Sequence, residues 1–139
     1  MGTITTTMRN ARLSLLSTAI DAGSGPGTLK IYTGSKPAGP ASAATGTLLA
    51  SITLNDPSCA SPSNGSMALV VSPAIADSSA DATGTAGWAR FADSDDNGVH
   101  DVSVTATGGG GELTFPSVSF VSGTNIGITS YTFTESAGS

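Results

Sequence analysis

The sequence predicts an all-β domain: an antiparallel β-sandwich or jelly roll of about seven to eight strands with one short N-terminal helix or arm. Two observations lead to this prediction. Apolar residues alternate with polar ones in short segments, and Gly, Pro, Asn and Asp turn signals separate these segments about every ten residues. Only 11% of the residues are charged, so the surface must be mostly Ser, Thr, Gly and Asn. Such a surface favours strands over helices, whose exposed faces use Glu, Lys, Arg and Gln.

One helix is expected over residues 8–22, with Thr7 as the N-cap and Gly23 as the C-terminal stop. Its predicted apolar residues recur at three- and four-residue steps, and they are Met8, Ala11, Leu15, Ala19 and Ala22, with Leu16 and Ile20 beside them. A helix this short must dock on something to persist. The partner is either its own sheet or a neighbouring subunit.

The strands are expected at residues 28–34, 47–54, 66–72, 85–93, 98–107, 112–120 and 125–136. Residues 73–84 are predicted to be a loop, and the four glycines at 108–111 a flexible connector. A bend is expected at Pro116, and a β-bulge near Ser130 would explain a change of apolar parity there.

Alternation also assigns the aromatic residues to faces. Trp88 and Arg90 share one face of their strand, and Phe91 lies on the other. Trp88 is either a core residue or an interface anchor, and Tyr32 points outward.

A chain of 139 residues suits one domain, with residues 1–27 forming the arm and helix and residues 28–139 the β-sandwich. The net charge is −5 and the pI is about 4.3. A nucleic-acid partner is therefore not expected, because binding phosphates requires a basic surface. We also expect no membrane span and no secretion signal, since no sufficiently long apolar run is present.

The most distinctive motif is "FADSDDNGVHD" at residues 91–101, which begins like the calcium loop of an EF-hand. Position 12 of such a loop should be Glu and is Val104, and strands rather than helices are expected on both sides. We therefore favour a hairpin turn in which Gly98 supplies a positive φ. A weak calcium site remains the alternative, with Asp93, Asp95, Asn97 and Asp101 as its candidate ligands.

No catalytic residue and no cofactor are predicted. The single histidine, His100, is expected to face solvent or an interface, or to pair with a nearby Asp. The single cysteine, Cys59, is expected to be a half-exposed thiol without a function. A small hydrolase is the least favoured class, because no nucleophile and base stand at a recognisable spacing.

Four phrases resemble a group of short proteins encoded among the structural genes of tailed bacteriophages. They are "GPGTLKIYTGSKPAGPASAATGTLLASITL", "DATGTAGWARFADSDDNGVHDVSV", "GELTF" and "IGITSYTFT". The resemblance implies a virion component that is similar to capsid decoration, or cement, proteins. It further implies a homo-oligomer, a dimer or trimer, that binds the major capsid protein at the capsid surface after synthesis in the host cytoplasm.

The alternative function is a calcium-assisted adhesion or glycan-binding β-module of a tail or fibre. For the decoration function, two segments are contact candidates. Residues 1–12 could extend and add a strand to a neighbour. The loop at residues 34–46 contains prolines, which lower the entropy lost on docking.

Overall fold

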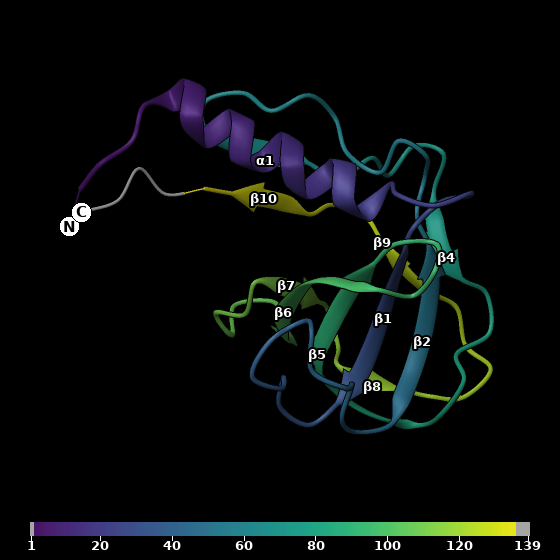
Figure 1. The fold of residues 1–139 in the computed structure, drawn as a ribbon. Helices are drawn as coiled ribbons and strands as arrows, with labels where there is room; N and C mark the ends of the chain where they lie inside the picture. Colours follow the sequence, from purple (N-terminus) through teal and green to yellow (C-terminus); the bar gives the residue numbers. More distant parts are fainter. Residues whose placement is uncertain (1, 136–139) are drawn as a thin grey trace.

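We describe a computed structural model of the chain over residues 2–135 (Figure 1). The chain is mostly β with one helix, and its elements are α1 (Thr6–Ile20), β1 (Thr28–Thr33), β2 (Leu48–Thr53), β3 (Ser66–Ala68), β4 (Ile75–Asp77), β5 (Gly84–Ala92), β6 (Gly98–Ala106), β7 (Leu113–Phe115), β8 (Ser119–Phe120), β9 (Ile126–Ile128) and β10 (Thr132–Thr134).

The largest sheet in the described residues has the order β2-β1-β5-β6-β7, and β8 pairs with the start of β5. The predicted hairpin of β5 and β6 is confirmed, with Trp88 opposite Ser103 and Phe91 opposite His100. The prediction of a purely antiparallel sheet is wrong, because β7 runs parallel to β6. The glycines between them allow the chain to turn back across the end of β6, so that Leu113 pairs with Val104.

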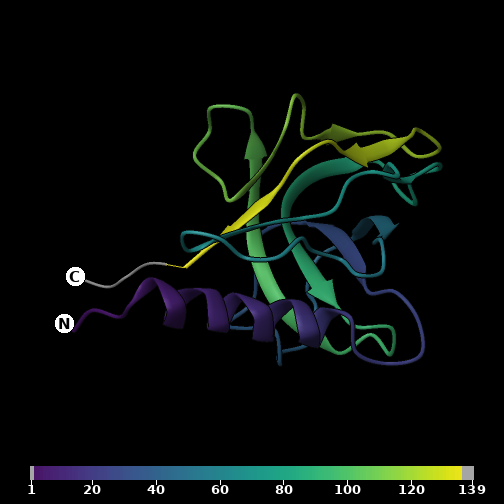
Figure 2. The same ribbon diagram turned by 90° about the horizontal axis from the view of Figure 1, so that it is seen from above.

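The inner face of this sheet carries the main core. Leu29, Phe91 and His100 stand side by side on β1, β5 and β6, and Ile31, Ala89 and Val102 form the next row. Seen from above, the ribbon of the long strand β5 is strongly curved (Figure 2). The predicted alternation along β1 is confirmed, since Leu29 and Ile31 are buried while Lys30 and Tyr32 are less so.

The described residues also form two small two-stranded sheets, β3 with β10 and β4 with β9. Residues 73–84 were expected to be a loop, but they contain β4, whose Asp77 accepts a hydrogen bond from the Ser51 backbone N–H at 3.0 Å. A bulge near Ser130 was also expected. The parity changes instead because the chain leaves β9 on one small sheet and enters β10 on the other.

The helix begins two residues earlier than predicted. Thr5, not Thr7, is the N-cap, and its side chain accepts a hydrogen bond from the Met8 N–H at 3.2 Å. The last helical residue is Ile20, and Asp21 caps the C-terminus. Among residues 2–135, no helix has the length and apolar character needed to span a bilayer.

The helix docks through a face that the prediction covered only in part. Leu13 and Ile20 are buried in the core and Leu16 packs against it. Leu16 and Ile20 were among the predicted apolar residues, but the main predicted row, Met8, Ala11, Leu15, Ala19 and Ala22, is exposed. The helix therefore has two apolar stripes, and the one with the larger side chains faces the sheet.

The outer face of the sheet is covered by the loop at residues 34–46. Trp88 lies there, fully buried, with its ring stacked on Tyr32 at a centroid distance of 4.6 Å. Its indole N–H donates a hydrogen bond to the carbonyl oxygen of Thr45 at 3.2 Å. Trp88 is thus on the opposite face from Phe91, as predicted, and is covered by the chain's own loop. That loop was one of the two segments expected to bind a partner, and part of it is already used to cover Trp88.

Two leucines on α1 provide a test of the assignment of faces. Leu13→Ala is expected to lower the free energy of unfolding by about 2–5 kcal/mol, because it leaves a cavity under the helix. Leu15→Ala is expected to change it by about 0.5 kcal/mol or less, because that side chain is 71% exposed. Urea unfolding of both variants measures the difference. Equal losses would contradict the observed orientation of the helix.

Candidate functional site

The aspartate motif folds as a turn organised by Asp93. The Asp93 carboxylate accepts hydrogen bonds from the backbone N–H groups of Asp95 and Asn97, at 3.0 and 2.9 Å, and from the Asn97 side-chain amide at 3.1 Å. The Asn97 backbone N–H is the main cause that lowers the pKa of Asp93. The oxygens of this carboxylate are therefore already used within the turn.

The positive φ of this turn belongs to Asp96, at 65°, and not to Gly98 as predicted. Gly98 is required for another reason, since a Cβ there would collide with the carbonyl oxygen of Pro40. The residue thus lets the loop at residues 34–46 approach the hairpin.

Two of the other acidic residues of the motif, Asp96 and Asp101, form separate ion pairs. Asp96 pairs with Lys30 at 2.8 Å. Asp101 receives two hydrogen bonds from Arg90, at 2.8 and 3.1 Å, and both side chains are nearly buried. In the part of the chain that the structure describes, no three His, Cys, Asp or Glu side chains are grouped to hold a metal ion. The four candidate ligands Asp93, Asp95, Asn97 and Asp101 thus belong to a turn and to an ion pair.

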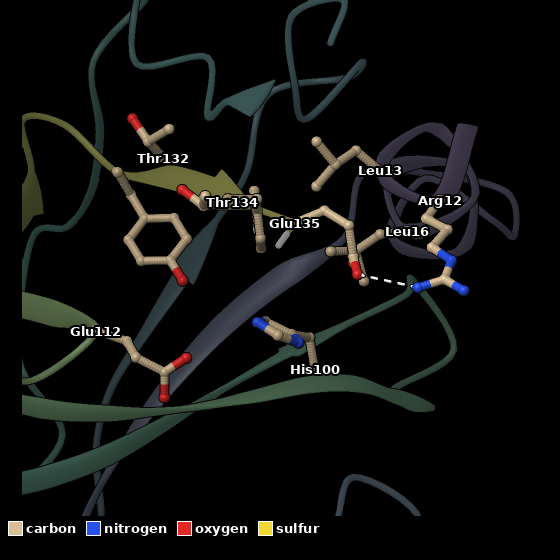
Figure 3. A pocket seen from close by; sticks show the side chains of 10 residues that line it. Arg12, Leu13, Leu16, His100, Glu112, Thr132, Thr134 and Glu135 are labelled. Atoms are coloured by element: carbon tan, nitrogen blue, oxygen red, sulfur yellow. Dashed lines mark hydrogen bonds and ion pairs between the residues drawn. The ribbon is translucent and has the colours of Figure 1, made fainter. Parts of the chain in front are cut away.

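A groove with a volume of about 480 Å³ lies between α1, β6 and β10 (Figure 3). Arg12 and Leu16 line it from the helix, and Thr132, Thr134 and Glu135 line it from β10 and the residue that follows. Arg12 donates a hydrogen bond across it to Glu135 at 3.2 Å. This ion pair is largely exposed, so it contributes little to stability.

His100 lies at one side of the groove and is half-buried among aromatic rings, which corrects the prediction that it faces solvent or an interface. Its ring centroid is 5.5 Å from that of Phe133 and 6.1 Å from that of Phe91. Its parity explains this position, because His100, Val102 and Val104 share the inner face of β6. Burial lowers the pKa of His100, and this effect outweighs the nearby charges of Glu112 and Asp101. The neighbouring Asp101 is hydrogen-bonded to Arg90, and among residues 2–135 no hydrogen bond joins the His100 ring to an aspartate.

Glu112 and Tyr131 complete the groove. The Glu112 carboxylate accepts hydrogen bonds from the Ser103 backbone N–H and from Lys36, both at 3.3 Å. Burial is the main cause that raises the pKa of Tyr131, and the nearby Glu112 charge acts in the same direction. A neutral imidazole and a protonated phenol can donate and accept hydrogen bonds, so the groove has the chemistry of a small polar binding site.

The thiol of Cys59 is buried, which corrects the expectation of half exposure. Its pKa is raised, first because of burial and then because of the Asp21 charge, while a hydrogen bond with Ser58 acts in the opposite direction. A thiol that stays protonated is a poor nucleophile. Cys59 is also not among the residues that line the groove.

A second hollow, of about 630 Å³, lies on the outer face between residues 40–44 and the tip of the hairpin. Tyr32, Arg90, Asp96 and Asn97 are among its lining residues. Arg90 also lies over the Trp88 ring, with its guanidinium carbon 5.2 Å from the ring centroid.

Sequence reasoning identified the hairpin turn but missed the groove. Its charged residues, Arg12, Glu112 and Glu135, are far apart in the chain and have no motif in common. The parity of His100 with Val102 and Val104 was the one signal available, and it indicated an inward position.

Comparison with known proteins found no match: no family model, no curated protein and no solved structure matches this chain.

The position of His100 makes stability depend on pH. The folded state holds the pKa of His100 below its usual value of about 6.5, so the unfolded state binds more protons below that pH. We therefore expect His100 to leave the free energy of unfolding unchanged at neutral pH and to lower it as the pH falls from about 6.5 towards 5. Urea unfolding at several pH values measures this dependence.

The matched variant is His100→Phe, which keeps an aromatic ring beside Phe91 and Phe133 and should show a flatter profile over the same range. A wild-type protein that gained stability below pH 6.5 would indicate a charged imidazole paired with Glu112 or Asp101, contrary to the burial argument.

Proposed function

We propose that this chain is a virion structural protein of a tailed bacteriophage, a capsid decoration or cement protein that binds the outer shell and bridges major capsid subunits. The structural observation that carries the proposal is the exposed apolar stripe on α1, which the domain does not use and which offers a surface for contact between copies held side by side on a shell. The resemblance of residues 25–54, 81–104, 111–115 and 126–134 to phage structural proteins supplies the kind of partner.

The surface chemistry supports this role. With 11% charged residues, the chain can make broad contact while desolvating few charges. A net charge of −5 disfavours adhesion to packaged nucleic acid. A protein that binds only the assembled shell stabilises it by mass action, so no catalytic group is needed.

The fold also supports the proposed decoration function. We propose that the main sheet forms one layer of a β-sandwich and that the pairs β3–β10 and β4–β9 form the second. Such a rigid body can present α1 at one side as a contact surface. A dimer or trimer on the capsid surface, assembled from chains made in the host cytoplasm, is part of the same proposal.

Electron microscopy of the particle that carries this chain tests the location. We expect density for the domain on the outer shell, and a copy number on a stained gel comparable with that of the major capsid protein, since the contact would repeat with the symmetry of the shell. Density in the tail with only a few copies per particle would overturn the proposal.

The alternative function is a calcium-assisted adhesion or glycan-binding module of a tail or fibre. The hollow between residues 40–44 and the hairpin favours it, because the half-exposed ring of Tyr32 and the polar side chains of Asp96 and Asn97 face the same space. Sugars bind to aromatic rings flanked by hydrogen-bonding groups of this kind.

Calcium titration calorimetry separates the two functions. We expect no binding heat, because Asp93 is engaged in its own turn and Asp101 is paired with Arg90. A clear heat that disappears in Asp95→Ala, but persists in Asp81→Ala outside the motif, would favour the calcium-assisted module.

A further inference from the structure

The outward side of α1 carries apolar residues with no partner in the domain. Met8 is 49% exposed and Leu15 is 71% exposed, and they are two of the three large apolar side chains that the described residues expose. In Figures 1 and 2 the helix lies at the edge of the molecule, with one side turned away from the strands. We call the exposed set Met8, Ala11, Leu15, Ala19 and Ala22 the outer stripe.

The outer stripe is symmetric about Leu15. Within the helix, Ala11 and Ala19 stand four residues before and after it, and Met8 stands seven residues before it, while Ala22 follows the C-cap Asp21. A two-fold axis perpendicular to the helix at Leu15 would therefore exchange Ala11 with Ala19. These small residues would let two helices approach closely on either side of the central leucines.

The charges of the helix also favour an antiparallel partner. The first turn has no acidic residue and the last turn has no basic one. Instead Arg9 and Arg12 lie in the N-terminal half and Asp21 caps the C-terminus, so each charge opposes the dipole of its own helix. In an antiparallel pair, Arg12 of each copy would lie beside the C-terminal half of the other. At that C-terminal end the helix dipole has its negative pole, and Asp21 carries a negative charge.

The size of the outer stripe sets the expected strength of the association between two copies. A helix of 15 residues is about 22 Å long, and one stripe on it buries a few hundred Å² at most, against about 800 Å² per partner for a standard interface. The pair should thus be weak in solution and should form at high local concentration, as on a shell that holds many copies side by side.

We propose that the outer stripe is an interface between two copies of this chain, formed by antiparallel packing of α1 on α1 about a two-fold axis at Leu15. The proposal deepens the proposed function by naming one partner in the decorated shell. Self-association of the purified chain can be measured without any shell, so the two proposals can fail separately.

Sedimentation equilibrium of the purified chain at rising concentration is the first test. We expect a reversible monomer–dimer equilibrium. Leu15→Glu should raise the dissociation constant about tenfold or more, because it places two carboxylates against each other at the axis. Ser14→Glu is the matched control, since it adds the same charge at an exposed neighbouring position outside the stripe. It should leave the dissociation constant within about twofold of wild type.

Single cysteines test the geometry. Under mild oxidation, Leu15→Cys should link to itself, because residue 15 meets its own copy at the axis. Ala11→Cys and Ala19→Cys should each remain unlinked alone and should link when mixed. The wild-type chain is the control, because its buried Cys59 should not react.

Three results would overturn the proposal. A wild-type chain that stays monomeric at every concentration has no such interface. An Ala11→Cys chain that links to itself indicates a parallel pair. If Leu15→Glu weakens binding to shells or to lipid vesicles while wild type and variant are both monomers, the stripe docks on that partner and not on a second copy.

Discussion

The packing of Phe91 against Phe133 joins the main sheet to the elements that cover it. Phe91 is fully buried at the centre of the sheet, between Leu29 and His100 on the neighbouring strands. Its ring centroid is 5.0 Å from that of Phe133, which lies on β10 in a separate small sheet. β10 in turn leads directly to Glu135, which pairs with Arg12 on the helix. This aromatic contact therefore fixes the β10 wall of the groove against the main sheet.

The opposite face of the β5–β6 hairpin is stabilised by a nearly buried ion pair as well as by aromatic rings. Arg90 and Asp101 form a nearly buried ion pair there, beside the stacked rings of Tyr32 and Trp88. Removing charges from water is costly unless they are paired and hydrogen-bonded, and this pair is both. The hydrogen bond from Arg90 to the Gly39 carbonyl, at 3.2 Å, ties the loop at residues 34–46 to it. The loop can therefore cover Trp88 without a helix or a second sheet.

Local patterns in the sequence were sufficient for the elements whose partners are near in the chain. Alternation and the Asp93–Gly98 turn identified the hairpin of β5 and β6, and Pro116 marked the break between β7 and β8. The parallel pairing of β7 with β6 was missed, because the residues give no sign of strand direction across a glycine-rich crossover. The strand β4 was missed because it has only three residues and its partner β9 lies about fifty residues later.

The groove was not predictable because its residues come together only in the folded chain. Arg12, His100, Glu112 and Tyr131 belong to four different segments. The helix face was misassigned for a different reason: the sequence has two stripes, and periodicity alone cannot say which one faces the sheet. The larger side chains of Leu13, Leu16 and Ile20 bury more apolar area than the alanines, and burial of area decides the orientation.

The helix α1 has two apolar stripes that face in different directions, and Arg12 lies between them. Leu13 and Leu16 line the groove, and Leu15 points away from it, so packing at the outer stripe leaves the groove open. Arg12 contacts Glu135 on the groove side, yet its side chain is 53% exposed. An exposed ion pair of this kind contributes about 1 kcal/mol or less. In the proposed pair of helices, Arg12 can therefore turn towards the C-terminal turn of the second copy at little cost in stability.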